Sequence, residues 1–564
     1  MPVRPPSRLL RRALPLAGAA LLPLAAPASA HAQAPAPPAD SVRAAVDRVF
    51  ARAQWTAPDG PGCAAAVARD GRVVHEGGYG AANLETGTPI TPASVFHLAS
   101  VSKQFTAAAI LLLEKDGKLS LDDDVRKHLP ELPDYGHRIT IRHLLTHTSG
   151  LRDQWDLLAI ARGRFEENRI TESDVLEIVA RQKALNFVPG SEYLYSNTGY
   201  TLAGTIVRRV SGQSLRDFAE ARIFRPLGMT RTQFQDDYTR VIVNRAAGYA
   251  RRADGQWHVS LPNYDTYGAT SLFSTVGDLL RWQANLVTPT VGDSAMVREM
   301  TTLRTLANGD TSAYGYGLVA ERHRGARIVS HGGADAGYRT WLGRFPEHGL
   351  DVVVLCNAAS SNPAALGRAV ADVFLPATLA ASQPPMPPTV TLAPAQLRAL
   401  AGAFVHPVTG AMNVISLRGD SLIAGRTAGP VLVPIGPRRF RARGQPVEFE
   451  FLEDGSVREH GIGWPARTPV TWRRTTIVQP TAAQLAEYAG TYHSEELGAT
   501  YTVTVRDTAL VLKTRWGSDD VLRPAYADAF AGPYLAQFTR TRGKVDGMLL
   551  STGRVRKVAF VRTR

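Results

Sequence analysis

Cysteine is almost absent from this chain: its 564 residues include only two, Cys63 and Cys356. Neither has a further metal-ligating residue at the short spacing of a zinc or redox motif, which excludes a cysteine-rich scaffold and a cysteine metal centre. Each cysteine lies in an apolar stretch that predicts a strand. A disulfide between them and two buried thiols in adjacent strands are both compatible with this pattern. We predict no metal and no cofactor.

Long apolar runs are also missing. Beyond residue 26, no stretch reaches the ~20 apolar residues that a membrane helix needs. The first 30 residues combine a short apolar run over 13–26, a small-x-small site at 28–30, and four early arginines: Arg4, Arg8, Arg11 and Arg12. This pattern is typical of a secretory signal peptide. We therefore predict a signal peptide over 1–30, a linker over 31–40, and an exported mature protein, periplasmic or secreted, without a membrane-spanning segment.

Acidic residues are outnumbered, and the formal net charge is +14. Removing the four leader arginines leaves about +10, because the leader carries no acidic residue. The remaining arginines are scattered rather than interleaved with aromatic residues, and no nucleic-acid motif is present. We therefore predict a small-molecule or peptide substrate and no nucleic-acid partner. The sequence leaves the oligomeric state open.

The chain is too long for one hydrophobic core, so we expect several domains. Strand patterns at 62–69 and 72–76, joined by Asp70-Gly71, predict a β-hairpin. Further segments are predicted as strands at 326–330, 338–345 and 350–356, as helices at 41–53 and 362–374, and as helices with polar loops over 144–283. Strands at both ends with helices between them predict an α+β domain over 41–376, whose single antiparallel sheet is flanked by helices and interrupted by an inserted helical region.

The last part of the chain contains an internal repeat. After a proline-rich linker predicted over 377–391, the segment 395–404 recurs as 483–492. At the same offset Leu422 corresponds to Leu510, and Trp472 to Phe560. Short strands and turns dominate both copies. We therefore predict two small all-β barrel domains, over 392–475 and 480–564.

The segment 96–103 contains the first candidate for chemistry. Ser100 and Lys103 precede an apolar run over 105–113 that ends at Asp116-Gly117, which predicts a helix with a glycine stop. Residues three apart share one helix face, so the hydroxyl and the amine can be hydrogen-bonding neighbours. A capping serine followed by a solvated lysine would have the same spacing. Lysine is scarce in this arginine-rich chain, which favours a functional role for Lys103 over a solvated side chain.

Two further segments have candidate polar residues. Tyr195 and Asn197 lie two apart in what the sequence predicts to be an extended loop, so their side chains project to the same side. His331 follows a predicted strand and precedes Gly332 and Gly333, where a substrate backbone could approach the strand edge. Taken separately, these residues are more typical of core tyrosines in a turn and a packed histidine.

Together the three segments resemble the penicillin-recognising serine hydrolases. Ser-x-x-Lys, Tyr-x-Asn and His-Gly-Gly occur in the chain order of the class C β-lactamase-like branch, which includes esterases, D-aminopeptidases and D-Ala-D-Ala carboxypeptidases. The segments 141–151, 226–229 and 272–279 also resemble the sequences of this branch. The resemblance covers about 41–375 and implies a β-lactamase-like catalytic domain. The two terminal repeats resemble the lipocalin-like barrels of three-domain D-aminopeptidases.

The resemblance implies a role for each candidate. Ser100 would be the nucleophile, Lys103 would lower the cost of removing its proton, and Tyr195 would act with the lysine as general base. Asn197 would hold the lysine and the substrate amide. The backbone N–H groups of Ser100 and Ala334 would form the oxyanion hole.

Other positions depart from the family's pattern. His331 occupies the place of a lysine in many relatives, and would meet a substrate carboxylate or tune Tyr195. Gly332 and Gly333 would bind substrate. The segment 268–271 has fewer glycines than relatives and is expected at the cleft rim, and His147 is expected to be a structural turn residue.

The sequence thus supports an exported serine hydrolase that cleaves amide or ester bonds through an acyl-enzyme on Ser100. D-Amino-acid peptides, β-lactams and small esters are all compatible substrates. The alternative is a catalytically idle penicillin-recognising protein that binds cell-wall peptides.

Overall fold

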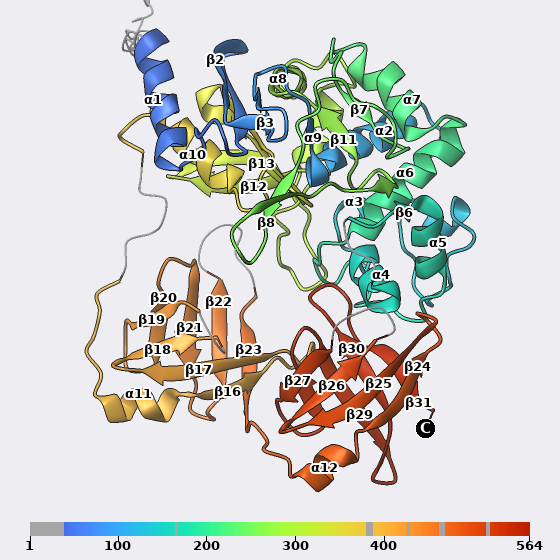
Figure 1. The fold of residues 1–564 in the computed structure, drawn as a ribbon, viewed down its shortest axis with the longest axis vertical. Helices are drawn as coiled ribbons and strands as arrows, with labels where there is room; N and C mark the ends of the chain where they lie inside the picture. The colour runs from blue at the N-terminus through green and yellow to red at the C-terminus, as the bar shows by residue number, and fades with distance from the viewer. Residues whose placement is uncertain are drawn as a thin grey trace, which may run out of the picture.

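The computed structural model describes residues 39–563 except 164–166, 380–386, 426–428, 462–467 and 515–518. It contains an α+β unit followed by two β-barrels (Figure 1). The predicted signal peptide, most of the linker after it, and much of the proline-rich linker lie outside the described residues. Within the described ranges, no helix has the length and apolarity needed to cross a membrane.

The α+β unit is built on a six-stranded sheet made from both ends of that unit. Its strands lie in the order β12-β13-β14-β15-β1-β2, and the neighbouring pairs are antiparallel. Their bounds are β1 Cys63–Arg69, β2 Arg72–Tyr79, β12 Val319–His323, β13 Ala326–Asp335, β14 Tyr338–Phe345 and β15 Leu350–Cys356. The pairing of β1 with β15 confirms the prediction that the two ends share one sheet.

Helices cover both faces of this sheet. On one face α1 (Ala39–Arg52) and α10 (Pro363–Phe374) pack together, with Val46, Phe50 and Val370 in the core that they share with the strands. On the other face α8 (Val276–Asn285) contacts β1 and β15, while α2 (Lys103–Lys115) packs against α6 (Asn197–Ser211). Burial of these apolar faces holds the two layers on the sheet.

The remaining elements of this unit form the inserted helical region and its edges. Its helices are α3 Ile141–Leu145, α4 Gln154–Arg162, α5 Glu172–Ala180, α7 Leu215–Ala219 and α9 Ser294–Thr301. Its short strands are β3 Ala81–Asn83, β4 Thr88–Pro89, β5 Phe96–His97, β6 Ile170–Thr171, β7 Gln233–Phe234, β8 Tyr249–Arg251, β9 Trp257–Val259, β10 Tyr264–Asp265 and β11 Leu272–Ser274. Strands β5, β11 and β7 form a second small sheet beside the start of α2.

The two cysteines, whose pairing the sequence left open, are joined as a disulfide. They are direct partners in the antiparallel ladder between β1 and β15, and both are fully buried. The bond closes a loop with a sequence separation of 293 residues. It therefore links the two chain segments on which the sheet depends.

Each predicted repeat closes into an eight-stranded barrel, as the sequence analysis expected. Barrel 1 consists of β16 Gly402–Val405, β17 Met412–Arg418, β18 Ser421–Ala424, β19 Val431–Pro434, β20 Arg439–Ala442, β21 Val447–Phe451, β22 Val457–Gly461 and β23 Val470–Thr475. Barrel 2 consists of β24 Gly490–Ser494, β25 Ala499–Arg506, β26 Ala509–Lys513, β27 Asp520–Pro524, β28 Ala529–Ala531, β29 Leu535–Thr541, β30 Lys544–Ser551 and β31 Val558–Arg562. A short helix precedes each one, α11 Pro394–Leu400 and α12 Ala482–Ala486.

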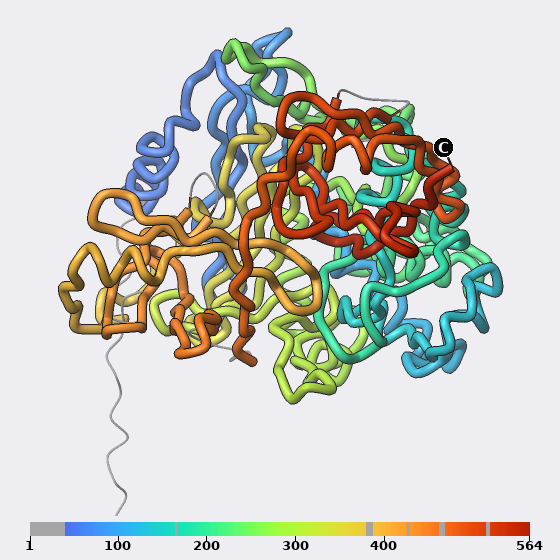
Figure 2. Tube along the Cα trace, turned by 90° about the horizontal axis from the view of Figure 1, so that it is seen from below, coloured from blue at the N-terminus to red at the C-terminus, as the bar shows by residue number. Residues whose placement is uncertain are grey.

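Barrel 2 docks on the inserted helical region, where Figures 1 and 2 show its red strands beside the cyan helices. Arg152, with 1% of its side chain exposed, forms a 2.6 Å ion pair with Glu496, which is 7% exposed. The Tyr501 hydroxyl donates a hydrogen bond to the Ile160 carbonyl, and Arg556 pairs with Glu192 at 3.0 Å. Together these polar contacts fix the orientation of the barrel.

Candidate active site

Ser100 lies on a tight turn between β5 and α2. The turn is a 3₁₀ helix over Ala99–Ser102, and Ala99 has a left-handed φ of 50°, a strained conformation for a residue with a side chain. The Ser102 hydroxyl holds the turn, since it donates to the Ala99 carbonyl at 2.6 Å and accepts from the Leu272 amide at 3.1 Å. Helix α2 follows, as predicted, and ends before Gly117, whose φ is +70°. The turn leaves the Ser100 hydroxyl facing a cavity.

Lys103 is fully buried behind this serine. Its Nζ donates hydrogen bonds to Ser100 Oγ at 3.0 Å, Asn197 Oδ1 at 2.9 Å and the Ala269 carbonyl at 2.7 Å. The two carbonyl-type oxygens can only accept, so a neutral amine would direct its two protons to them and its lone pair to the serine hydroxyl. The contact with Ala269 corrects the expectation that 268–271 lies at the cleft rim: this backbone passes directly behind the lysine.

Burial also changes the proton affinity of this lysine. Desolvation lowers the pKa of Lys103 from 10.5 to about 7, against the smaller opposing effects of Asp335 and Asp153. An amine with a pKa near 7 is divided between its charged and neutral forms at neutral pH. Lys103 is therefore able to accept a proton from Ser100.

Asn197 begins helix α6, which corrects the prediction that it lies in an extended loop. The helix starts here because Asp153, from a distant part of the chain, caps it. One carboxylate oxygen of Asp153 accepts both the Asn197 backbone N–H at 2.6 Å and its side-chain Nδ2 at 2.9 Å. Since a carboxylate only accepts, the Asn197 amide must turn its oxygen to Lys103. Sequence reasoning missed Asp153, which resembles an ordinary cap of α4.

Tyr195 lies beside the serine and the lysine. Its hydroxyl is hydrogen-bonded to Ser100, and Lys103 Nζ stands 4.9 Å from the centre of its ring. Burial is the main cause that raises the pKa of Tyr195 above its ordinary value of 10. The tyrosine therefore stays a neutral phenol that can both donate and accept a proton.

His331 reaches the same cavity from β13, but as a neutral ring. Desolvation lowers the pKa of His331 to about 3. Its Nδ1 donates to the Gly332 carbonyl at 2.6 Å, so Nε2 accepts from the Tyr314 hydroxyl at 2.8 Å.

His147, at a left-handed φ of 58°, does occupy a turn, and its ring also packs 4.1 Å from that of Tyr195. Sequence reasoning missed Tyr314 and this ring contact.

The end of β13 forms an open strand edge. Strand β12 pairs with Ala326–Ser330, and within the described residues no strand pairs with 331–335 on that side. Gly332 and Ala334 are exposed there. Gly333 has a different reason to be glycine: a Cβ atom would lie 2.2 Å from the Leu98 carbonyl and 3.0 Å from the Ala99 side chain. Its absence of a side chain lets the strand approach the turn that holds Ser100.

These residues surround one cavity of about 640 Å³. Its lining is Ser100, Trp155, Tyr195, Asn197, His331, Gly332, Gly333, Ala334, Asp335, Arg339, Thr340, Ser360, Ser361, Asn362, Pro363, Ala364 and Arg554. All the sequence-predicted site residues except the buried Lys103 thus face it. No group of histidine, cysteine and carboxylate side chains in the described ranges is arranged to hold a metal ion.

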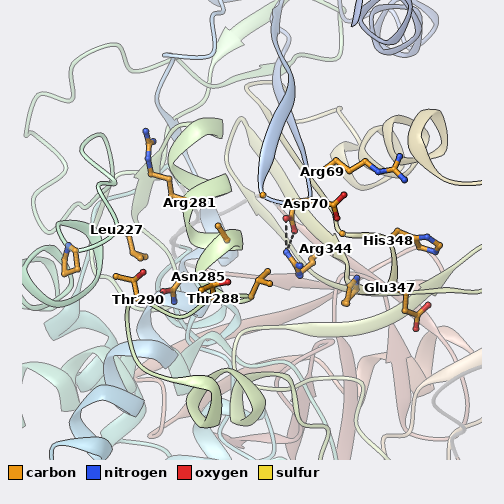
Figure 3. Close-up of a pocket in the computed structure, with 17 residues that line it drawn as sticks. Arg69, Asp70, Leu227, Arg281, Asn285, Thr288, Thr290, Arg344, Glu347 and His348 are labelled. Carbon is orange, nitrogen blue, oxygen red and sulfur yellow. Dashed lines mark hydrogen bonds and ion pairs between the residues drawn. The ribbon is translucent and has the colours of Figure 1, made fainter. Parts of the chain in front are cut away.

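A larger hollow of about 1000 Å³ lies elsewhere, beside the β1–β2 turn and the end of α8. Figure 3 shows its charged lining, in which Arg344 pairs with Asp351 at 2.7 Å. The described lining holds no serine, cysteine or lysine that could act as a nucleophile. The smaller cavity around Ser100 is therefore the candidate active site.

Comparison with known proteins agrees with this fold. The family model described as Beta-lactamase matches residues 46–375, and the chain belongs to that family. It is 28% identical over 445 residues to a D-aminopeptidase of Gluconobacter oxydans, covering 78% of this chain and 80% of the relative. It is 33% identical to Penicillin-binding protein 4* of Bacillus subtilis, covering 52% and 67%.

One solved structure also shares the fold across most of the chain. The octameric penicillin-binding protein homologue from Pyrococcus abyssi covers 84% of this chain and 98% of its own, with a TM-score of 0.53 and 22% identity. The predicted fold class and the predicted family are both confirmed.

Proposed function

We propose that this protein is an exported serine hydrolase that cleaves amide or ester bonds through an acyl-enzyme on Ser100. The observation that carries the proposal is the buried contact between Ser100 and Lys103, with two other acceptors fixing the direction of the amine. A structural lysine at a helix start would be solvated, whereas this one is held behind a hydroxyl that faces a cavity.

In the proposed reaction, neutral Lys103 takes the proton of Ser100 as Oγ attacks the substrate carbonyl carbon. The backbone N–H groups of Ser100 and Ala334 stabilise the negative oxygen of the tetrahedral intermediate. As the carbon–nitrogen or carbon–oxygen bond breaks, the proton on Lys103 passes through the Tyr195 hydroxyl to the leaving group. Water then attacks the ester carbon and gives a proton to the same pair, which passes it to Ser100 Oγ as the acyl–oxygen bond breaks and the acid leaves.

The names of the relatives support the proposed substrate class. Several are named D-aminopeptidase, and one is named Penicillin-binding protein 4*. We propose D-amino-acid peptides, β-lactams or small esters as substrates, and the exposed backbone at Gly332 and Ala334, with Gly333 between them, as the edge along which substrate binds. Barrel 2 contributes Arg554 to the lining of the cleft.

Export is part of the proposal. The basic and apolar leader over 1–30 directs the chain out of the cytoplasm, and the Cys63–Cys356 disulfide suits an oxidising compartment. Mass determination of the mature protein recovered from the periplasm or medium tests the predicted cleavage near residue 30.

Covalent labelling of Ser100 tests the enzyme against the idle binding protein. A fluorophosphonate probe is expected to label the wild type, and labelling should vanish in Ser100→Ala because the nucleophilic oxygen is gone. The control is Ser360→Ala, an exposed serine that lines the same cavity and should still be labelled at Ser100. Intact mass spectrometry measures the adduct. Equal absence of label in the wild type and in Ser100→Ala would favour the binding protein.

The pH dependence tests the state of Lys103. Because burial lowers its pKa to about 7, the neutral form is present above that pH and lost below it. As the pH decreases, protonation of Lys103 near pH 7 should lower kcat/KM for a neutral ester. One pH unit below that pKa, kcat/KM should be about a tenth of its high-pH plateau. Stopped-flow hydrolysis of p-nitrophenyl acetate over pH 5–9 measures this. A rate that is still rising at pH 9 would mean that the lysine stays charged.

A further inference from the structure

His147 packs against Tyr195 but is not among the described residues that line the active-site cavity. It is 1% exposed, and its left-handed φ of 58° is strained for a residue with a side chain. A turn alone would be less strained with glycine at this position. We propose that His147 is a positioning residue, whose Nδ1 fixes the segment 194–196 so that the Tyr195 hydroxyl stays on Ser100. The inference rests on the proposed function and adds a residue that acts through Tyr195.

Two hydrogen bonds to His147 flank Tyr195 on the chain. The His147 carbonyl accepts the Leu194 amide at 3.0 Å, and its Nδ1 accepts the Ser196 amide at 3.1 Å. Ser196 has an extended backbone, with φ −134° and ψ 122°. Amides two apart in an extended segment point to the same side, so a single residue can accept both. His147 therefore fixes the backbone immediately before and immediately after the tyrosine.

These contacts also determine which ring nitrogen of His147 carries the proton. A backbone N–H only donates, so Nδ1 must present its lone pair and Nε2 must hold the hydrogen. Burial is the main cause that lowers the pKa of His147 well below 6.5, and the charge of Lys103 acts in the same direction. The ring therefore stays neutral and keeps its acceptor. Among the described residues Nε2 has no hydrogen-bond partner, so the polar contact that the ring makes is the one to Ser196.

The imidazole ring restrains the aromatic side chains of the site as well. Its centre lies 4.1 Å from that of Tyr195, and 4.4 Å from that of Tyr314, which it meets edge to face. The Tyr314 hydroxyl in turn donates to His331. Proton transfer requires hydrogen-bond contact, and a shift of about 1 Å in a reacting group can cost about a hundredfold in rate. Loss of the His147 ring would give Tyr195 room for such a shift away from Ser100.

His147 and Asp153 support different steps of the proposed reaction. Asp153 orients Asn197, which accepts from Lys103, the base that removes the serine proton. His147 instead contacts Tyr195, which passes the proton to the leaving group. Loss of His147 should therefore slow the departure of a leaving group that needs a proton more than it slows the attack on the carbonyl carbon.

Two acetate esters with different leaving groups separate these steps. p-Nitrophenolate is a weak base that departs without a proton, whereas phenolate is more basic and departs faster when it is protonated. We expect His147→Ala to lower kcat/KM about a hundredfold for phenyl acetate and about tenfold or less for p-nitrophenyl acetate. His147→Asn should regain about tenfold with phenyl acetate, because Asn Oδ1 can replace Nδ1 as acceptor and asparagine tolerates a left-handed φ. Steady-state spectrophotometry measures both phenols.

His143→Ala is the matched control. His143 Nδ1 also accepts a backbone amide, that of Thr140 at 3.3 Å, and this residue is absent from the described cavity lining. Its loss should leave the ratio of the two kcat/KM values unchanged. Partial unfolding of any variant lowers both rates equally, so this ratio reports the placement of Tyr195 rather than stability.

The outcomes separate the two proposals. An unchanged ratio in His147→Ala, an equal change in His143→Ala, or no recovery in His147→Asn would overturn the positioning role of His147 while leaving the hydrolase intact. Absence of Ser100-dependent turnover of p-nitrophenyl acetate in the wild type would refute the hydrolase itself, and the positioning role with it.

Discussion

Replacement of Lys103 by alanine is expected to lower kcat/KM for any ester or amide substrate by about 10³-fold or more. The substitution removes the base that receives the Ser100 proton, and no other amine contacts that hydroxyl in the part of the chain that the structure describes. Because Ser100 and Lys103 act as one unit, the Ser100→Ala/Lys103→Ala double variant should be no slower than the worse single variant. Steady-state kinetics on p-nitrophenyl acetate measures all three.

Lys115→Ala is the matched control for this prediction. Lys115 ends the same helix, but is half exposed and pairs with Asp293 at the surface, so its loss should leave kcat/KM nearly unchanged. Circular dichroism and thermal melting check that Lys103→Ala remains folded, since it leaves the oxygens of Asn197 and Ala269 without their buried donor. A folded Lys103→Ala protein with wild-type turnover would remove the lysine from the mechanism.

The elements around the site could be predicted because each has a local pattern. The apolar run after Lys103 and the glycine after it define α2, and the Asp70-Gly71 turn defines the first hairpin. The 88-residue offset between the repeats aligns Leu422 with Leu510, and both are fully buried in equivalent barrel strands. Periodicity and repetition are properties of short segments, so the sequence reports them directly.

The supporting residues of the site have no such pattern. Lys103 is held by the Ala269 carbonyl, a group that every residue has, and Asn197 is oriented by Asp153, 44 positions away. Arg554 is one arginine among many, and its place above Tyr195 depends on how barrel 2 docks. The disulfide likewise depends on the register of β1 against β15, which the sequence leaves undetermined. These features arise from tertiary packing.

A buried ion pair lies in the interface between barrel 2 and the helical region, and breaking it is expected to have a large effect on stability. Arg152 pairs with Glu496 at 2.6 Å and also donates to the carbonyls of Arg556 and Lys557, which belong to the loop that carries Arg554. Glu496→Ala leaves the Arg152 guanidinium buried without its carboxylate, which costs about 3–5 kcal/mol. We expect barrel 2 to dissociate from the helical region at a lower temperature than in the wild type, as measured by differential scanning calorimetry.

The neighbouring Glu495 provides the control, because it pairs with Lys183 on the exposed rim of the same interface. Glu495→Ala should leave the melting profile nearly unchanged, since an exposed pair gains little from its charges. Arg152 is followed directly by Asp153, which orients Asn197, so loosening this interface should also reduce kcat with p-nitrophenyl acetate. If Glu496→Ala melts like Glu495→Ala and keeps full activity, barrel 2 is held by its apolar contacts, and the path from Glu496 through Arg152 to Asp153 does not support the site.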